Sequence, residues 1–357
     1  MASLEDLPIR DDLRGRKPYG APQLDVAVAL NVNENTHRIP EAVAIDVVGA
    51  IAAALIDINR YPDREFTALR SALANYLGEG LKAENLWAAN GSNEVLLQIF
   101  QAFGGPGRKA LGFGPTYSMY SLLALTTGTL YFDAPRADKY ELTTELVLDA
   151  IKTHKPAIVL LCSPNNPTGT PLSLSVIEAA YEATDGIVVV DEAYAEFSGA
   201  ESATSLLAGR PRLLVSRTMS KAFAFAGARV GYLAADPGAI DALRLVRLPY
   251  HLSAFTQAAA TAALRHSELM LETVSEIRYQ RDRLTFELTE LGFEVFRSEA
   301  NFVLFHGLKD SAASFEYLLS QGILVRNVGI PNTLRVTAGT EEETSKFLEA
   351  TRNLVKL

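Results

Sequence analysis

Short runs of consecutive apolar residues, many of them β-branched, recur through the middle of the chain at 157–161, 187–190, 213–215 and 230–233. They lack the polar alternation of a half-exposed strand, so they indicate strands covered on both faces, as in a mostly parallel sheet. The segment 174–183, which lies between two of these runs, is amphipathic. The pattern therefore predicts an α/β core with right-handed crossover helices.

The pattern changes on either side of this core. The first 45 or so residues, punctuated by prolines, predict an irregular arm, and residues 43–58 permit a helix. Beyond residue 245, a long helical stretch at 257–291 precedes short apolar runs, which predict a smaller α+β domain, at 293–296, 302–305, 323–325 and 334–336. We expect an arm with part of the small domain at 1–45, a large domain at 46–250, and an interdomain helix with the small domain at 251–357.

Composition narrows the class of protein. The 357 residues are 48% hydrophobic, which is enough apolar material for two packed domains. The formal net charge of −9 argues against a nucleic-acid or anionic-membrane partner, because both reward basic patches. A single cysteine, Cys162, rules out an intrachain disulfide framework, and we expect a reducing cytoplasm. We also expect a soluble protein, because no signal-peptide pattern and no spanning apolar run is present.

Lys221 follows the third apolar run and precedes Ala222-Phe223-Ala224. An isolated lysine is usually a surface residue whose stem lies along apolar neighbours. Here, however, Arg229 follows eight residues later among small residues that favour the approach of a bulky anion. The pair therefore indicates a buried lysine beside an anion site.

Asp191 directly follows the run 187–190, and a carboxylate at the end of a buried strand is costly unless it meets a cation. The protonated pyridine nitrogen of pyridoxal 5′-phosphate is such a cation, and Asp191 would keep that ring an electron sink. Tyr194 is placed to donate a hydrogen bond to the phenolic oxygen of the same ring. A helix N-cap is the plain alternative for Asp191.

Other polar groups also follow predicted strands, where open α/β sheets place their ligands. The segment 163–169 forms a rigid turn that presents Asn166, although an ordinary turn fits its composition equally well. Residues 91–93 open a helix at 95–103, either as an anion cradle or as ordinary caps. Tyr117 either covers one face of a flat ring or packs in the core.

Two arginines near the C-terminus are candidates for binding carboxylate or phosphate groups. Arg335 lies within the predicted strand 333–337, and its planar fork binds a carboxylate bidentately. Arg326 is the second candidate, with a local salt bridge as the alternative. The five histidines are scattered, so we expect no metal site.

These groups combine into one chemistry. Lys221 would form an imine with the cofactor, which requires a pKa lowered by burial and nearby cations. Its freed amine would then act as a general base, Asp191 would sustain the electron sink, and Arg229 with residues 91–93 would hold the phosphate.

Three motifs in this order carry a family resemblance: Ser163-Pro164-Asn165-Asn166-Pro167-Thr168-Gly169, Asp191-Glu192-Ala193-Tyr194, and Ser220-Lys221 followed by Ala226-Gly227-Ala228-Arg229-Val230-Gly231-Tyr232. Over nearly its whole length the chain resembles the fold-type I pyridoxal-phosphate aminotransferases. Within them it is most similar to the histidinol-phosphate aminotransferases of histidine biosynthesis, on segments 30–35, 60–63, 248–253 and 323–329.

The resemblance implies roles for the cofactor site. Asn166 and Tyr194 would bond the ring oxygen, Tyr117 would stack on the ring, and Lys221 would carry the cofactor. The phosphate would be held by Gly91, Ser92, Asn93, Thr218, Ser220 and Arg229. Tyr61 would reach the phosphate of the neighbouring subunit, which makes the expected enzyme a homodimer.

The resemblance also implies the substrate site. Arg335 would bind the carboxylate of glutamate or 2-oxoglutarate, and Arg326 with Tyr19 would help hold histidinol phosphate. The remaining substrate contacts would come from Asn33, Asn93 and Tyr250. Two residues depart from the family pattern: Thr36 stands where proline is usual, and Asn93 where an acidic residue is frequent, which could alter contact with an imidazole.

Three alternatives remain open on sequence alone. An aminotransferase for phenylalanine or tyrosine is the nearest, since an aromatic ring can replace an imidazole. A threonine-phosphate decarboxylase shares most cofactor motifs. A transcription regulator built on this fold would need a DNA-binding module, and the 45-residue arm is too short and not basic enough.

Overall fold

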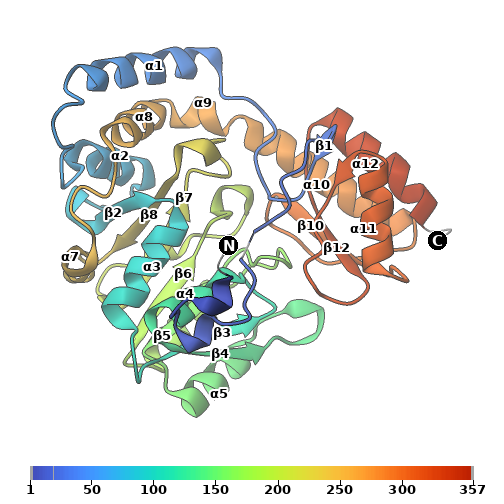
Figure 1. Ribbon diagram of the computed structural model, residues 1–357, viewed down its shortest axis with the longest axis horizontal. Helices are drawn as coiled ribbons and strands as arrows, with labels where there is room; N and C mark the ends of the chain where they lie inside the picture. Colours follow the sequence, from blue (N-terminus) through green and yellow to red (C-terminus); the bar gives the residue numbers. More distant parts are fainter. Residues whose placement is uncertain (1–2, 19, 355–357) are drawn as a thin grey trace.

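The computed structural model describes residues 3–18 and 20–354, which form a larger and a smaller part with the N-terminal arm between them (Figure 1). The α-helices are α1 (Glu41–Ile56), α2 (Thr67–Leu77), α3 (Ser92–Phe103), α4 (Met119–Thr127), α5 (Thr144–His154), α6 (Leu174–Glu182), α7 (Pro237–Val246), α8 (Ala254–Arg265), α9 (Ser267–Leu271), α10 (Thr273–Glu290), α11 (Ser311–Ser320) and α12 (Glu341–Leu354). The arm contains two short 3-10 helices, Leu4–Asp6 and Asp11–Leu13.

A seven-stranded sheet in the order β2-β8-β7-β6-β5-β3-β4 forms the centre of the larger part. Its strands are β2 (Leu86–Asn90), β3 (Lys109–Gly114), β4 (Leu130–Pro135), β5 (Ile158–Cys162), β6 (Ile187–Asp191), β7 (Leu213–Thr218) and β8 (Val230–Ala235). Only β8 runs antiparallel to its neighbours. The predicted α/β fold with a mostly parallel sheet is therefore confirmed, and the four apolar runs correspond to β5, β6, β7 and β8.

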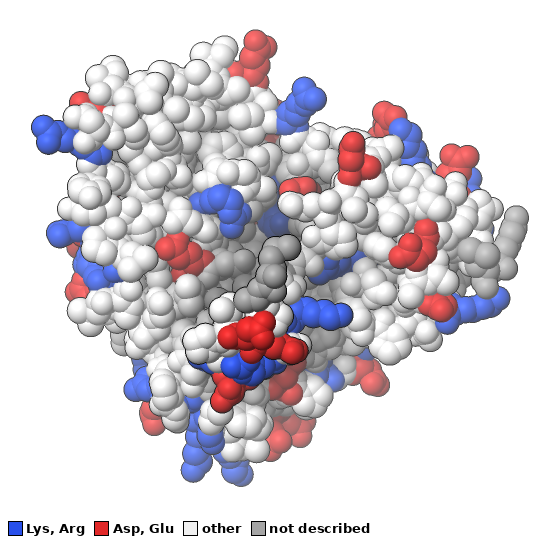
Figure 2. All heavy atoms as spheres, in the orientation of Figure 1, with Lys and Arg blue, Asp and Glu red and all other residues white. Residues whose placement is uncertain are grey.

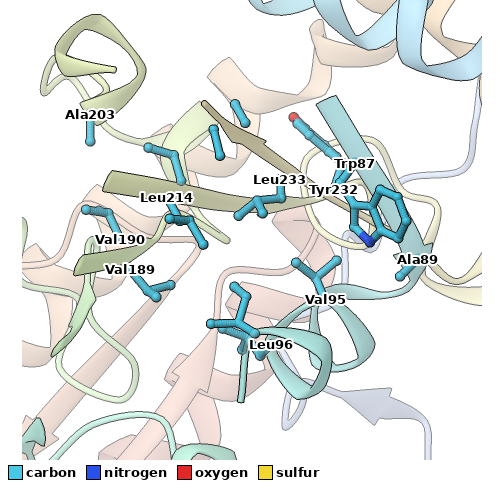
Figure 3. Close-up of a cluster of buried hydrophobic side chains, with 14 of the residues drawn as sticks. Trp87, Ala89, Val95, Leu96, Val189, Val190, Ala203, Leu214, Tyr232 and Leu233 are labelled. Atoms are coloured by element: carbon cyan, nitrogen blue, oxygen red, sulfur yellow. The ribbon is translucent and has the colours of Figure 1, made fainter. Parts of the chain in front are cut away.

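Both faces of this sheet are buried, which explains why its central strands are apolar at consecutive positions. Figure 3 shows Val95 and Leu96 of α3 beneath the sheet, close to Leu233 and Trp87. The side chain of Trp87 is fully buried, and its indole N–H donates to Gln98 at 2.6 Å. The buried polar group is thus satisfied without water.

The smaller part is built on a three-stranded antiparallel sheet in the order β12-β10-β9. Its strands are β9 (Glu294–Val295), β10 (Phe302–His306) and β12 (Thr333–Thr337), with a separate parallel pair of β1 (Val28–Ala29) and β11 (Ile323–Leu324). The arm therefore adds its strand to the C-terminal part, where Val28 and Leu30 are buried. α10, α11 and α12 cover the sheet (Figure 1).

The expected helical stretch at 257–291 is three helices, α8, α9 and α10, rather than one. The chain leaves helical geometry at His266, which has φ −114° and ψ 30°. The His266 ring bonds the Asp46 carboxylate of α1 at 2.9 Å, so packing against α1 favours the break.

The buried hydrophobic side chains fall into two clusters. The larger extends from Val43 to Met270, and the smaller combines Val28 and Leu30 with Tyr194, Phe197, Ala222 and residues from Ile277 onward. The domain division at residue 250 stays a prediction. We propose moving its boundary to the α9–α10 junction, because Leu252 and most of the buried face of α8 pack in the larger cluster. Within the described residues, no helix is long and apolar enough to cross a membrane.

Candidate active site

A cavity of about 510 Å³ opens at the carboxyl ends of the central strands, between the two parts. It is lined by groups from the arm, the large sheet and the C-terminal part. The predicted site residues that line it are Asn33, Ser92, Asn93, Tyr117, Asn166, Asp191, Tyr194, Thr218, Ser220, Lys221, Arg229, Arg326 and Arg335.

Three of the predicted residues that the structure describes do not line this cavity. Gly91 lies directly behind it, beside Arg229. Tyr61 and Tyr250 stack on each other with ring centroids 4.4 Å apart, and the Tyr61 side chain is exposed. Tyr19 lies outside the described residues.

Lys221 is the lysine of the cavity, three residues beyond the end of β7. Its Nζ donates a hydrogen bond of 2.8 Å to the backbone carbonyl of Val32 in the arm. Burial, followed by the nearby Arg335 and Arg229 cations, lowers the pKa of Lys221 to about 8, although Glu34 opposes this. An amine with this pKa has a far larger neutral fraction near physiological pH than an ordinary lysine, and the neutral form is the one that acts as a nucleophile or general base.

Asp191 ends β6, and its carboxylate is almost fully buried. Tyr120 of α4 donates a hydrogen bond of 2.8 Å to Oδ2, while Oδ1 has no hydrogen-bond partner among residues 3–18 and 20–354. Burial raises the pKa of Asp191 to about 6, and the Tyr120 hydroxyl opposes that rise. A buried, unpartnered carboxylate oxygen at a cavity wall is suited to binding a cationic group.

Tyr194 lies on the loop after β6, with its hydroxyl among amides. The Nδ2 groups of Asn33 and Asn166 donate to its Oη at 3.0 and 3.4 Å. Burial raises the pKa of Tyr194 to about 12, which Arg335 and Asn33 partly offset. The phenol therefore stays protonated, and its own O–H is available to donate into the cavity.

Arg335 of β12 reaches across from the C-terminal part. Its Nη1 donates to Asn166 Oδ1 at 2.6 Å and its Nη2 to the carbonyl of Asn31 at 2.7 Å. The guanidinium also lies over the Phe302 ring, 5.1 Å from its centroid. These contacts hold the fork in place before a ligand arrives, which reduces the entropy lost on binding. The backbones of Arg326 and Arg335 are joined by two hydrogen bonds of 3.0 and 2.9 Å, so the two arginines are direct neighbours across a β-bridge.

Arg229, Thr218, Ser220 and the start of α3 gather at one end of the cavity. The Thr218 hydroxyl donates to Ser220 Oγ at 3.0 Å and accepts from the Ser220 N–H at 3.1 Å. Gly91 has φ +85°, and a Cβ there would collide with the Arg229 guanidinium. The lack of a side chain thus lets Arg229 approach the positive end of α3, where an anion is favoured.

Gly231, one of the small residues near Arg229, has a role in packing. A Cβ on Gly231 would collide with the backbone of Gly91 and Ser92, so this glycine serves the chain's own packing. It brings β8 against the start of α3. Similarly, Ser92 and Asn93 belong to the first turn of α3, and its N-cap is Gly91.

Tyr117 and Asn93 form one wall. The Tyr117 hydroxyl donates to Asn93 Oδ1 at 3.0 Å, so the residue that departs from the family pattern orients the predicted ring-covering tyrosine. The other departure, Thr36, has a buried hydroxyl with no partner among the described residues.

The sequence analysis missed several contributors. Tyr120 and the backbone carbonyls of Asn31 and Val32 contact the predicted residues directly. Tyr120 lies in α4, which begins at Met119, whereas Tyr117 precedes the helix, so their spacing gave no clear signal. The carbonyls carry no residue-type signal.

A buried ion-pair network lies behind the cavity. Arg217 of β7 donates to Glu192 Oε2 at 3.0 and 2.8 Å and to Glu196 Oε1 at 3.4 Å. Glu192 also accepts from Ser202 and the Ala203 N–H at 2.7 Å each. The network ties the segment after β6 to β7, and thereby fixes Asp191 relative to Thr218.

These features fit the groups of pyridoxal 5′-phosphate. The unpartnered Asp191 Oδ1 suits a protonated ring nitrogen, the Tyr194 hydroxyl suits a ring oxygen, and the space beside Gly91 and Arg229 suits a phosphate. Lys221 supplies the amine that an aldehyde needs.

Comparison with known proteins defines the class. The family described as aminotransferase class I and II matches residues 26–350, and the chain belongs to it. The histidinol-phosphate aminotransferase of Paenarthrobacter aurescens (strain TC1) is 59% identical over 357 residues, covering 99% of this chain and 96% of that protein. That of Thermobifida fusca (strain YX) is 56% identical, covering 98% and 95%.

Solved structures agree with this family. The histidinol-phosphate aminotransferase from Sinorhizobium meliloti in complex with pyridoxal-5′-phosphate superposes with a TM-score of 0.83 at 27% identity. The match covers 93% of this chain and 91% of that chain. The neighbour therefore shares the fold-type I architecture, including the sheet whose carboxyl ends form the cavity.

Proposed function

We propose that this protein transfers an amino group between L-histidinol phosphate and 2-oxoglutarate, in histidine biosynthesis, with pyridoxal 5′-phosphate as cofactor. The reversible reaction gives imidazole acetol phosphate and glutamate. The observation that carries the proposal is the convergence of Lys221, Asp191, Tyr194 and Arg335 on one cavity. The names of relatives at 50–59% identity support the substrate.

When bound, the cofactor supplies an aldehyde that bonds amines and a ring that accepts electrons. Lys221 would hold it and, once displaced by substrate, move a proton at Nζ between substrate and cofactor carbons. The Val32 carbonyl orients that amine. Asp191 Oδ1 would carry negative charge opposite the ring nitrogen, and Tyr194 and Asn166 would hold the ring oxygen. Tyr117 would cover the ring face.

Arg229, Thr218, Ser220 and the first turn of α3 would hold the cofactor's phosphate. The α3 dipole and the guanidinium both favour an anion there. This end of the cavity would anchor the cofactor and leave the part beside Arg335 and Arg326 for the substrate.

The substrate end has to accept two amino donors. Glutamate presents an α-carboxylate, for which the preset fork of Arg335 is suited. Histidinol phosphate carries a CH2–O–phosphate group at that carbon in place of the carboxylate, so its anionic group lies two bonds further out and needs a further cation. Arg326, which lines the cavity on the backbone next to Arg335, would supply it, with Asn33 and Asn93 as further contacts. Tyr250 would act from a second copy, and Tyr19 stays a contact proposed from the sequence alone.

Truncating the two arginines should separate the half-reactions. Loss of a buried, charge-assisted contact costs roughly 2–5 kcal/mol for the substrate that uses it. Arg335→Ala should therefore slow the loss of the yellow cofactor absorbance more with glutamate than with histidinol phosphate. Arg326→Ala should slow it more with histidinol phosphate than with glutamate. Single-turnover absorbance with each donor measures both. Equal losses for the two donors in Arg335→Ala would remove Arg335 from the α-carboxylate site.

A homodimer is part of the proposal. Exposed apolar side chains occur on α1, in the loop after it, and from the end of α7 onward: Ile45, Val48, Leu55, Ile56, Ile58, Tyr61, Leu245, Leu248 and Tyr250. The surface over α1, at the upper left of Figure 2, is largely free of charged side chains. A patch of this size and character favours burial against a second copy. The single cysteine, Cys162, is buried, so no disulfide supports the fold, which suits the cytoplasmic location we propose.

Mixed dimers test whether Tyr61 acts across that interface. Tyr61→Phe should weaken cofactor retention by about 1 kcal/mol or slightly more, because a hydrogen bond to a charged acceptor is lost. Re-equilibrated with Lys221→Ala, the variant should form heterodimers that contain one site with both native residues, and part of the activity should return. Verified heterodimers without any recovery would place Tyr61 in its own subunit's site.

The second candidate is an aminotransferase for phenylalanine or tyrosine. It rests on the same cofactor groups, and on the Tyr117–Asn93 wall, which would accommodate either an aromatic ring or an imidazole. The two candidates differ at Arg326, because only histidinol phosphate brings a phosphate to it.

A further inference from the structure

Tyr120 is a buried tyrosine to which the reaction outlined above assigns no role. Its side chain has no exposed surface, and its hydroxyl donates to Asp191 Oδ2 at 2.8 Å. Burial raises its pKa well above the usual tyrosine range, so the hydroxyl stays protonated and acts as the donor in this contact. Its ring also packs edge-on against Tyr117, 5.5 Å between centroids.

The contact determines which oxygen of Asp191 faces the cavity. With Oδ2 engaged by Tyr120, Oδ1 is left buried and without a partner among residues 3–18 and 20–354. A carboxylate can rotate about its χ2 bond unless one oxygen is held. Tyr120 therefore restrains the oxygen that would meet the ring nitrogen.

The groups around Asp191 leave the Tyr120 hydroxyl as a main stabiliser of the ionised Asp191 carboxylate. Cys162, its register partner on β5, lines the same cavity, while Glu192 and Tyr194 follow it in sequence. Burial disfavours the ionised form of the Asp191 carboxyl group, and the negative charge of Glu192 disfavours it further. Besides the backbone N–H of Ala193, Tyr120 is the group that stabilises the ionised form of Asp191.

We infer that Tyr120 is a positioning residue, which directs Asp191 Oδ1 at the cofactor ring and keeps the shared proton on the ring nitrogen. This inference rests on the proposed function. Without the hydroxyl, Asp191 becomes the more basic partner. The proton then shifts from the ring nitrogen to the carboxyl group, and the ring becomes a weaker electron acceptor.

Tyr120→Phe removes the hydroxyl and keeps the ring that packs on Tyr117. We expect kcat to fall about tenfold or more, the worth of one hydrogen bond to a charged group. In the holoenzyme carrying cofactor labelled with 15N in the ring, the nitrogen resonance should move toward that of neutral pyridine. Tyr131→Phe is the matched control, because Tyr131 contacts Asp133 at 3.4 Å outside the cavity. It should change neither quantity.

A double-mutant cycle shows whether Tyr120 acts through Asp191. In the Asp191→Asn background, Tyr120→Phe should change kcat by less than about twofold, because contacting residues that act together are not additive. If the losses multiply instead and the 15N resonance matches that of the wild type, Tyr120 has only a structural role and the inference is wrong.

Replacing Tyr120 with a fluorinated tyrosine changes the acidity of the hydroxyl while keeping the ring and the contact, so the result does not depend on an effect on folding. The more acidic hydroxyl is a stronger donor, so the 15N resonance should move further toward the protonated form; an unchanged resonance would also overturn the inference. Failure of the proposed function looks different. In that case the wild-type protein itself would bind no cofactor, or its ring nitrogen would be neutral.

Discussion

Lys221→Ala should lose nearly all turnover, at least about 10³-fold, because the general base and the cofactor anchor disappear together. The amine is buried, its pKa is lowered to about 8, and its Nζ is 2.8 Å from the Val32 carbonyl. Lys152→Ala, on the exposed face of α5, is the matched control and should keep full activity. Steady-state kinetics of both variants measures the difference.

The covalent anchor can be identified directly. The purified wild-type protein should be yellow, and borohydride reduction should fix the cofactor on one peptide, the one that contains Lys221. Added methylamine should return a small part of the activity to Lys221→Ala, since a free amine can move the proton that the side chain no longer moves. Attachment to a different lysine would refute the assignment.

Asp191→Asn has the second-largest expected effect. The substitution preserves shape and the approach of Tyr120, but it removes the charge that a cationic ring nitrogen would meet. We expect kcat to fall about 10²–10³-fold, the range found when one preorganised electrostatic group is removed from an active site. Cofactor affinity should change far less, because the phosphate and Lys221 contacts remain.

Separate measurement of kcat and cofactor affinity distinguishes the possible roles of Asp191. Glu94→Gln is a useful comparison, because Glu94 is a carboxylate near the site that accepts from Asn90 and does not line the cavity. Weakened cofactor binding with an unchanged kcat in Asp191→Asn would mean that the carboxylate only anchors the ring.

The central sheet was predictable because burial on both faces leaves a compositional trace. β5 and β6 are apolar throughout their interior, and the polar residues that follow them mark the edge at which the cavity lies. Asn166, Asp191 and Lys221 were therefore found as strand-end residues. The edge strand β4 was missed, because it is partly exposed and its residues carry no clear alternation.

Contacts between distant parts of the chain left no such trace. Val32 contributes a backbone carbonyl to Lys221, and any residue type has that group. Gly231 makes room for the backbone at Gly91 and Ser92, a contact that its sequence position did not predict. Tyr120 lies in the apolar stretch that forms α4, where a tyrosine is typical of core packing. These roles depend on which elements meet, and that follows from the tertiary fold.

Local sequence pattern also could not predict which residues lie on the surface away from the cavity, or where the arm pairs. Tyr61 and Tyr250 lie together on the surface, stacked and away from the cavity of their own chain. Their proposed roles depend on a second copy. The arm was expected to be irregular, yet Val28 and Ala29 pair with Ile323 and Leu324, which brings Asn33 into the cavity. The pairing partner is about 295 residues away, as the register shows.

The substrate assignment is tested most directly by comparing kcat/KM for L-histidinol phosphate and L-phenylalanine, each with 2-oxoglutarate as acceptor. The account predicts that histidinol phosphate is preferred by at least about 10²-fold, since its phosphate gains a charge-assisted contact that phenylalanine lacks. Arg326→Ala should reduce that preference and leave phenylalanine nearly unaffected. A kcat/KM for phenylalanine equal to or above that for histidinol phosphate would contradict the proposed function.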